Sequence, residues 1–159
     1  MTILYEKIDD TKAAVFHELM VDYYRDAEDR DTPQAEIDGF IGQLFGLIAS
    51  ESIDGRLIYT EGDTAAGFVL WMIDRAESDF SEMPGYGTIL EIGLKESYRH
   101  QGIGKAIVDF AEARMKQAAA AGFYVLAYGP AQAFWLRRGY SESHRTGTNG
   151  LPLLTKPVL

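Results

Sequence analysis

The chain of 159 residues contains no cysteine, so neither disulfides nor thiolate metal sites can form. No hydrophobic run approaches the roughly 20 residues that a membrane-spanning helix needs. The first ten residues, MTILYEKIDD, lack the basic region and long hydrophobic stretch of a secretory signal peptide. We therefore expect a cytoplasmic protein with no membrane partner.

Basic side chains are also scarce. Lysine and arginine total 15 against 24 aspartates and glutamates, which gives a net charge of −9. This charge argues against general nucleic-acid binding, because phosphates need a cationic surface. It is compatible with a cationic substrate, although acidic surfaces also occur for solubility alone. The three histidines are scattered along the chain and predict no metal site.

The composition that remains is that of an ordinary soluble globular protein, with 47% hydrophobic and 25% charged residues. The length fits one domain over residues 1–159. Hydrophobic periodicity predicts helices within 9–31, from Thr32-Pro33 to about residue 48, from about 103 to 121, and over 131–139. It predicts strands at 2–8, in a hairpin over 56–74, and at 88–94, 123–128, 140–145 and 151–158. This order, with a strand–helix–strand unit in its middle, favours an α/β or α+β fold with a mixed sheet.

Two details of the third helix can be checked. Its inner face is expected to carry Ile103, Ile107, Phe110, Ala111, Met115 and Ala118. Gly122 stands where a glycine commonly ends a helix in the left-handed conformation.

The loop before this helix combines glycine with basic side chains. The stretch YRHQGIGKAIV, residues 98–108, places Gly102 and Gly104 behind Arg99 and His100. The N-terminus of a helix carries about half a positive charge and unpaired N–H groups. Glycine has no Cβ, so an anion can approach its backbone closely. The glycine pair alone also allows a simpler interpretation, a helix start with glycines for tight packing.

Two familiar phosphate-binding motifs are excluded. A Walker A loop would need glycine at position 99 and serine or threonine after Lys105, where the chain has Ala106. A dinucleotide-binding fingerprint would need a third glycine at position 107, which is Ile107.

The segment LKESYRHQGIGKAIVDFAEARM, residues 94–115, resembles the acyl-CoA motif of the GNAT superfamily of N-acyltransferases. The Arg/Gln-x-x-Gly-x-Gly/Ala pattern matches at Arg99, Gly102 and Gly104, and the aliphatic residue that usually precedes it is Leu94. A second family motif, Asn-x-x-Ala-x-x-Phe-Tyr-x-x-x-Gly-Phe, resembles YGPAQAFWLRRGY, residues 128–140. The element order over residues 56–140 follows the family, and the first 50 residues fit it by pattern.

Four positions depart from the family patterns. Tyr128 replaces the asparagine, Glu96 stands where proline is frequent, and Tyr140 replaces the final phenylalanine. Trp135 replaces the tyrosine that many members use as a general acid, and an indole N–H cannot supply a proton near neutral pH.

The resemblance implies a single GNAT-like domain with a mixed, mostly antiparallel sheet flanked by about four helices. It implies acetyl-CoA as cosubstrate, without a metal, in a cleft where the strand ending at Leu94 diverges from the strand 123–128. The backbone of residues 92–94 would pair with the pantetheine arm, one N–H would hold the thioester oxygen, and N–H groups of residues 100–104 would hold the pyrophosphate. The expected acetyl-CoA contacts are Ile92, Gly93, Leu94, Arg99, His100, Gln101, Gly102, Ile103, Gly104, Lys105, Phe134 and Trp135.

Two residues are candidates for proton transfer. A free alkylamine resembles lysine, whose pKa is about 10.4, so the acceptor arrives protonated and needs a base. Glu91 is the only carboxylate on the predicted central strand and is our candidate base. It could instead point away from the cleft and pair with a cation of a neighbouring strand, and a bulge would change the face that it occupies. Tyr128 could protonate the departing thiolate, or could simply pack at the end of its strand.

The sequence therefore predicts an N-acetyltransferase that moves an acetyl group from acetyl-CoA to a primary amine of a small molecule, by direct attack through a tetrahedral intermediate. Two alternatives stay open. One is a weak or inactive acyl-CoA-binding regulatory module, which Trp135 favours. The other is a protein lysine or N-terminal acetyltransferase. The expected partners are acetyl-CoA and the amine, with a homodimer possible.

Overall fold

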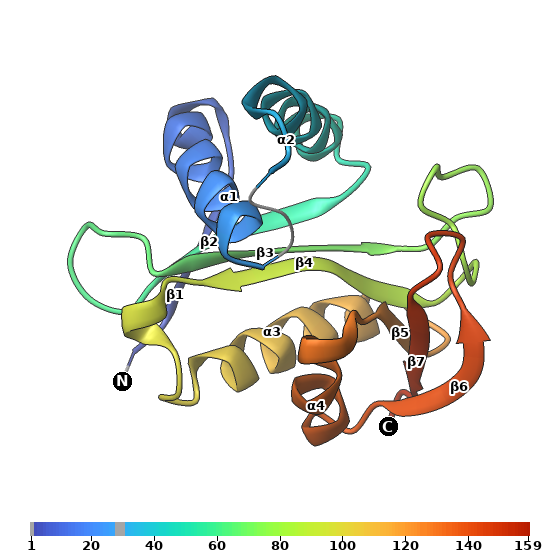
Figure 1. Cartoon of the computed structure of the whole chain (residues 1–159). Coiled ribbons are helices and arrows are strands. Elements are labelled where there is room, and N and C mark those ends of the chain that lie inside the picture. The colour runs from blue at the N-terminus through green and yellow to red at the C-terminus, as the bar shows by residue number, and fades with distance from the viewer. Residues whose placement is uncertain (1, 28–30) are drawn as a thin grey trace. The chain divides into compact units, whose positions relative to one another are not determined.

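The computed structural model describes residues 2–27 and 31–159. The elements follow the predicted order (Figure 1): β1 (Leu4–Lys7), α1 (Ala13–Ala27), α2 (Gln34–Ala49), β2 (Asp54–Tyr59), β3 (Gly67–Ile73), β4 (Gly87–Leu94), α3 (Ile103–Gln117), β5 (Phe123–Leu126), α4 (Gly129–Arg137), β6 (Ser141–Thr146) and β7 (Pro152–Lys156). Short 3-10 turns lie at Asp10–Lys12 and Glu96–Tyr98.

The strands form one seven-stranded sheet in the order β1-β2-β3-β4-β5-β7-β6. The pairing of β4 with β5 is parallel. The pairings of β1 with β2, β5 with β7 and β6 with β7 are antiparallel. The predicted α/β fold class, with a mixed sheet and four α-helices, is confirmed.

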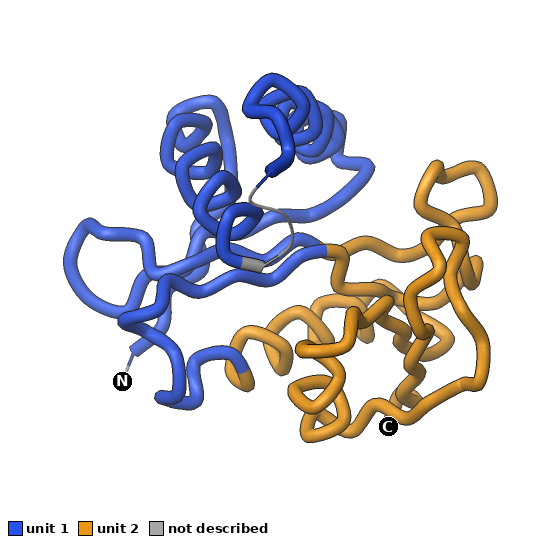
Figure 2. Tube along the Cα trace, viewed as in Figure 1, with its two compact units in different colours: residues 1–70, 91–104 blue, residues 71–90, 105–159 orange. Residues whose placement is uncertain are grey.

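The chain divides into two compact units (Figure 2). Unit 1 comprises Met1–Leu70 and Glu91–Gly104, and unit 2 comprises Trp71–Leu90 and Lys105–Leu159. The boundary crosses both β3 and β4, so each unit holds part of each strand. The single domain expected over residues 1–159 stays a prediction.

Unit 1 packs α1 and α2 around an aromatic core. The ring of Phe16 is completely buried and lies 6.4 Å from that of Phe45 and 6.1 Å from that of Phe68. The helical period predicts a hydrophobic stripe on α2, and its members are buried except for the half-buried Phe40: Ile37, Phe40, Ile41, Leu44 and Ile48. These contacts bury the hydrophobic stripe that the helical period predicts.

The helix ends of unit 1 differ from the prediction. Pro33 is the residue before α2 rather than its first helical residue, and its ψ of 139° is extended. The helix expected within 9–31 begins only at Ala13, after a turn in which the Asp9 carboxylate accepts the Thr11 N–H at 2.9 Å. Residues 28–30 of that expected helix lie outside the described residues.

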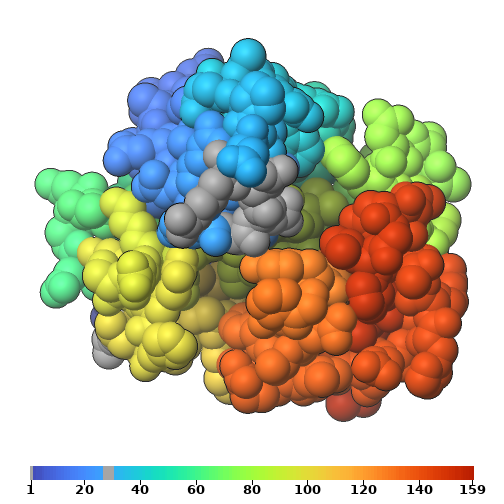
Figure 3. All heavy atoms as spheres, viewed as in Figure 1, coloured from blue at the N-terminus to red at the C-terminus, as the bar shows by residue number. Residues whose placement is uncertain are grey.

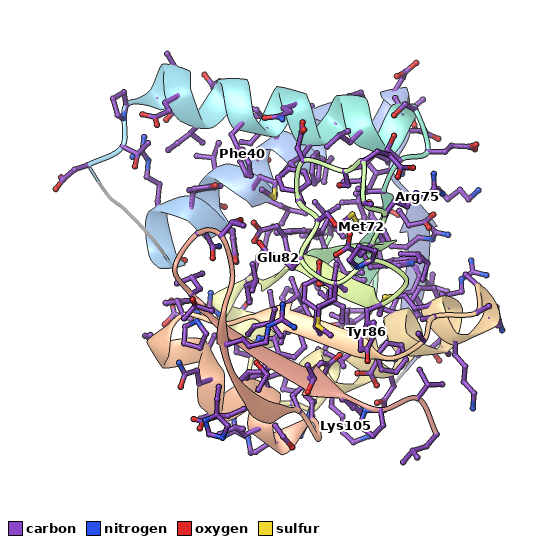
Figure 4. The ribbon with its side chains drawn as sticks, turned by 90° about the vertical axis from the view of Figure 1, so that its right-hand side faces the viewer. Phe40, Met72, Arg75, Glu82, Tyr86 and Lys105 are labelled. Atoms are coloured by element: carbon purple, nitrogen blue, oxygen red, sulfur yellow. The ribbon has the colours of Figure 1, made fainter. Side chains whose placement is uncertain are left out.

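Unit 2 is organised around the buried Asp74, which follows β3. Its Oδ2 accepts hydrogen bonds at 2.7 Å from the Tyr124 hydroxyl and from the N–H groups of Glu82 and Met83. Burial opposes ionisation of Asp74, but hydrogen bonds from Ser81, Tyr124 and these N–H groups outweigh it and hold the pKa below its usual value. The carboxylate thereby fixes the connection between β3 and β4, which Figure 4 shows with Glu82 labelled.

The end of α3 corrects two expectations. The helix ends at Gln117 rather than near residue 121, and Ala119, not Gly122, takes the left-handed conformation with φ 65°. The Ala120 N–H donates to the Met115 carbonyl at 3.1 Å, which completes the usual helix-ending motif. Gly122 is needed for packing, because a Cβ there would lie 2.6 Å from the ring of Tyr86.

The inner face of α3 is also corrected. Ala118 lies beyond the helix and is exposed, and Phe110 is only half-buried. Two residues outside the predicted face, Val108 and Glu112, are buried. The other predicted positions, Ile103, Ile107, Ala111 and Met115, are buried as expected.

Candidate functional site

Strands β3 and β4 are neighbours in the sheet, and backbone hydrogen bonds join the residues at their ends. The Asp74 N–H donates to the Tyr86 carbonyl at 2.7 Å, and the Lys95 N–H donates to the Ala66 carbonyl at 2.9 Å. Both bonds lie just beyond the ends of β3 and β4. The Ala66 N–H donates to Ile58 of β2 at 2.7 Å, so Ala66 connects to both neighbouring strands.

Strand β4 pairs with β5 only at its beginning. Among the described residues the register joins Gly87 to Phe123 and Thr88 to Tyr124, whereas β4 continues to Leu94. The later backbone groups on that side of β4 are therefore not used by the β5 ladder. The expected cleft between these two strands stays a prediction.

Gly93 is required by packing within unit 1. A Cβ at this position would lie 2.6 Å from Cε1 of Phe68 and 3.0 Å from Cδ1 of Tyr23. The two rings are 5.5 Å apart in an edge-to-face arrangement. The backbone of β4 thus lies directly against an aromatic pair, and a larger residue would displace it.

The loop after β4 is held in shape by its own side chains. The Arg99 Nε donates to the Leu94 carbonyl at 3.0 Å, and the Gln101 Nε2 donates to the Ser97 carbonyl at 3.0 Å. The yellow atoms of this loop are exposed on the face of unit 1 seen in Figure 3. The bonds preform the loop, which lowers the entropy lost when a ligand binds.

The backbone of this loop contains two left-handed residues. His100 and Gly102 have φ values of 62° and 82°, so two of three successive residues are left-handed. Helix α3 begins at the next residue, Ile103. Turns that contain left-handed residues can direct successive N–H groups toward an anion, and the first N–H groups of a helix have no intrahelical partner. A Cβ at Gly102 would meet no atom within 4 Å, so this backbone is open to a ligand.

The cationic side chains of the motif are engaged elsewhere. The Arg99 guanidinium lies 3.8 Å from the Asp26 carboxylate, and the Lys105 ammonium lies 2.7 Å from that of Asp109. Both ion pairs are solvent-exposed, so they hold these side chains only weakly. An anion bound at this loop would therefore be held mainly by backbone N–H groups, and the side chains of Arg99 and Lys105 would contribute less.

Unit 2 contains the remaining predicted residues. Tyr128 is half-buried and is the residue before α4, with φ −72° and ψ 159°. Trp135 is 5% exposed, and its ring lies 5.1 Å from Phe134 and 5.3 Å from Tyr140. Trp135 is therefore a core residue of unit 2.

Each unit thus contributes a distinct set of the predicted residues. Unit 1 brings together the backbone of residues 92–94 and the loop 99–104, with the half-buried Glu91 on the same strand. Unit 2 holds Lys105, Tyr128, Phe134 and Trp135.

Sequence reasoning missed two features, the left-handed His100 and the buried Glu112. Histidine is enriched among non-glycine residues in the left-handed region, which was the available signal for His100. No signal in the local pattern indicates burial of a glutamate.

Among the described residues, no group of three or more histidine, aspartate or glutamate side chains could hold a metal ion. Over the same residues no helix has both the length and the hydrophobicity for a membrane span.

The model of the Acetyltransferase (GNAT) family matches residues 5–140, so the chain belongs to this family. The class of activity of the family is acyl transfer from acetyl-CoA. Comparison with the curated proteins gives no match to this sequence.

Solved structures show the same fold. The PaiA N-acetyltransferase of Thermoplasma acidophilum, solved in complex with coenzyme A, is 18% identical with a TM-score of 0.76, over 99% of this chain and 100% of that chain. An acetyltransferase of Thermus thermophilus is 16% identical with a TM-score of 0.77, over 99% and 98%. A GCN5-related N-acetyltransferase of Ralstonia eutropha is 21% identical with a TM-score of 0.74, over 92% and 97%.

Proposed function

We propose that this protein is an N-acetyltransferase that transfers the acetyl group of acetyl-CoA to a primary amine of a small molecule in the cytoplasm. The observation that carries the proposal is the preformed loop 99–104, with two left-handed residues directly before α3. Backbone N–H groups of this loop supply positive potential without a metal ion. The short pairing between β4 and β5 supports the same proposal, because it leaves β4 backbone available to a ligand.

The proposed binding residues follow from this backbone. Backbone groups of Ile92, Gly93 and Leu94 would pair with the pantetheine amides as an added strand would. N–H groups of residues 100–104 would hold the pyrophosphate, with Arg99 keeping the loop closed on Leu94 through its 3.0 Å hydrogen bond. Acetyl-CoA supplies the activated acyl group, and the protein positions it.

Two side chains account for the protons. The amine nitrogen attacks the thioester carbonyl carbon, a carbon–nitrogen bond forms, and the carbon–sulfur bond breaks. In our proposal Glu91 takes the proton that the amine loses, and the Tyr128 phenol gives a proton to the departing thiolate. Trp135, buried in the core of unit 2, has a structural role in this scheme.

The test combines binding with turnover. Thermal unfolding is measured with and without acetyl-CoA, and thiol release is then followed across a panel of small amines, lysine peptides and peptides with free N-termini. Stabilisation together with thiol release from small amines supports the proposal. Release only with peptides would instead indicate a protein acetyltransferase, and stabilisation with no release from any amine would indicate a binding module. Absence of any stabilisation would exclude all three.

A further inference from the structure

Helix α4 ends in a turn that brings Tyr140 onto Trp135. The Tyr140 N–H donates to the Trp135 carbonyl and the Gly139 N–H donates to the Leu136 carbonyl, both at 3.1 Å. Gly139 has φ 94°, and these features together form a Schellman motif. The hydrophobic contact that accompanies this motif is the edge-to-face pair of Trp135 and Tyr140, with ring centroids 5.3 Å apart. The family departures at positions 135 and 140 are therefore in contact with each other.

The hydroxyl of Tyr140 reaches a carboxylate that is buried in unit 2. Glu112 of α3 is 8% exposed, and its Oε2 accepts the Tyr140 O–H at 2.8 Å. Its Oε1 accepts from the Lys156 ammonium of β7 at 2.7 Å. Lys156 also lies over the Tyr140 ring, 5.6 Å from its centroid. Both oxygens of the carboxylate thus have partners, as a buried charge requires.

Tyr140 acts as a hydrogen-bond donor in this cluster. Burial, and then the nearby Glu112 carboxylate, raises the pKa of the phenol above its ordinary value. The phenol therefore keeps its proton throughout the neutral range. Phenylalanine, the residue of the family pattern, would leave Glu112 with one partner fewer.

Helix α4 needs such an anchor because it is short. It has nine residues, and isolated helices below about 12 residues are marginal in water. Tyr128, the proposed proton donor, immediately precedes this helix. Its position is therefore determined by whatever fixes α4 within unit 2.

We propose that Glu112, Tyr140 and Lys156, the α4 anchor, are positioning residues that fix α4 on α3 and thereby hold Tyr128 in place for proton transfer. The predicted effect of these residues on turnover rests on the proposed function. Their predicted effect on the order of α4 does not depend on any catalytic activity.

The test removes one oxygen from each of two matched tyrosines. Tyr140→Phe removes the hydroxyl of the α4 anchor. Tyr124→Phe is the control, since Tyr124 is also 2% exposed and also donates to a buried carboxylate, that of Asp74, at 2.7 Å. We measure Tm, kcat, KM for acetyl-CoA, and amide hydrogen exchange over residues 128–137.

We expect both variants to lower Tm, and only Tyr140→Phe to accelerate hydrogen exchange over residues 128–137. The same variant should lower kcat by on the order of ten- to hundredfold with KM for acetyl-CoA unchanged, because misplacement of a reacting group by about 1 Å has effects of this size. In a Tyr128→Phe background, Tyr140→Phe should cause no further loss of kcat. If Tyr140→Phe does not fold, Lys156→Met removes the other partner of Glu112 and is expected to give the same results.

The outcomes separate this inference from the proposed function. Unchanged hydrogen exchange, or equal loss of kcat in the two tyrosine variants, would overturn the positioning role. A further loss of kcat in the Tyr128→Phe background would also overturn it. If the parent protein releases no thiol with any amine, the proposed function fails, and hydrogen exchange alone then decides whether the α4 anchor holds the helix.

Discussion

Replacing Gly102 with alanine tests whether the loop before α3 binds acetyl-CoA. Gly102 has φ 82° and open space where a Cβ would stand. A side chain at positive φ is strained by roughly 1–2 kcal/mol, and relieving the strain would turn the adjoining N–H groups away from a bound anion. The variant should therefore lose stability and, separately, lose binding.

Gly150→Ala is a matched control for the loss of stability. Gly150, in the turn between β6 and β7, has φ 81°, and a Cβ there would likewise meet no atom within 4 Å. The two variants carry the same backbone strain, so we expect similar decreases in Tm without ligand. They differ in that Gly150 lies outside the proposed acetyl-CoA contacts.

The expected ligand effects can be estimated. Acetyl-CoA at 100 times its Kd stabilises the native state by about 2.7 kcal/mol, which corresponds to an increase in Tm of about 5–10 °C for a protein of this size. If Gly102→Ala weakens binding a hundredfold, the same concentration adds only about 0.4 kcal/mol, or about 1 °C. The assay is thermal unfolding of the parent and both variants over a range of acetyl-CoA concentrations. A full increase in Tm for Gly102→Ala, equal to that of Gly150→Ala, would refute the binding role of this loop.

Three further predictions concern proton transfer and stability. Glu91→Gln should slow turnover, mostly at lower pH where the amine is protonated, and a pH–rate profile that overlays the parent would show that Glu91 is not the base. Trp135→Tyr should change kcat by no more than about tenfold and Tyr128→Phe should reduce it further; if Trp135→Tyr converts an inert binder into an enzyme, the catalytic proposal is wrong. Because the pKa of Asp74 is lowered in the folded state, it should stabilise the protein above about pH 4 and lose this effect as the pH falls through its folded pKa. Denaturant unfolding between pH 2 and 7 should show this dependence, and Asp74→Asn should weaken it; an identical dependence in the variant would assign it to other groups.

Local features of the candidate site were predictable from the chain. The glycines at 102 and 104 and the hydrophobic period after them indicated a loop followed by a helix, because both signals depend on neighbouring residues. Helix ends were less predictable. Ala119 takes the left-handed conformation that Gly122 was expected to adopt, and Gly122 is required for a different reason, because a Cβ there would clash with the Tyr86 ring.

The face that Glu91 occupies could not be predicted, because a single bulge in its strand would move the side chain to the other face. The structure shows Glu91 as half-buried. Its role as the base remains a prediction.

The sequence by itself determined the order of the elements, the loop at the start of α3 and membership of the acyltransferase fold, because these depend on local periodicity and on short motifs. Only the tertiary structure showed what surrounds Trp135 and Tyr140, two positions where the chain departs from the family patterns. Glu112 meets Tyr140 across 28 residues and Lys156 across 44, and no local pattern specifies contacts at such separations. A buried charge needs hydrogen-bond partners, and the Tyr140 hydroxyl supplies one to the Glu112 carboxylate, which phenylalanine could not do. This hydrogen bond is the reason that we propose Tyr140 as part of the α4 anchor.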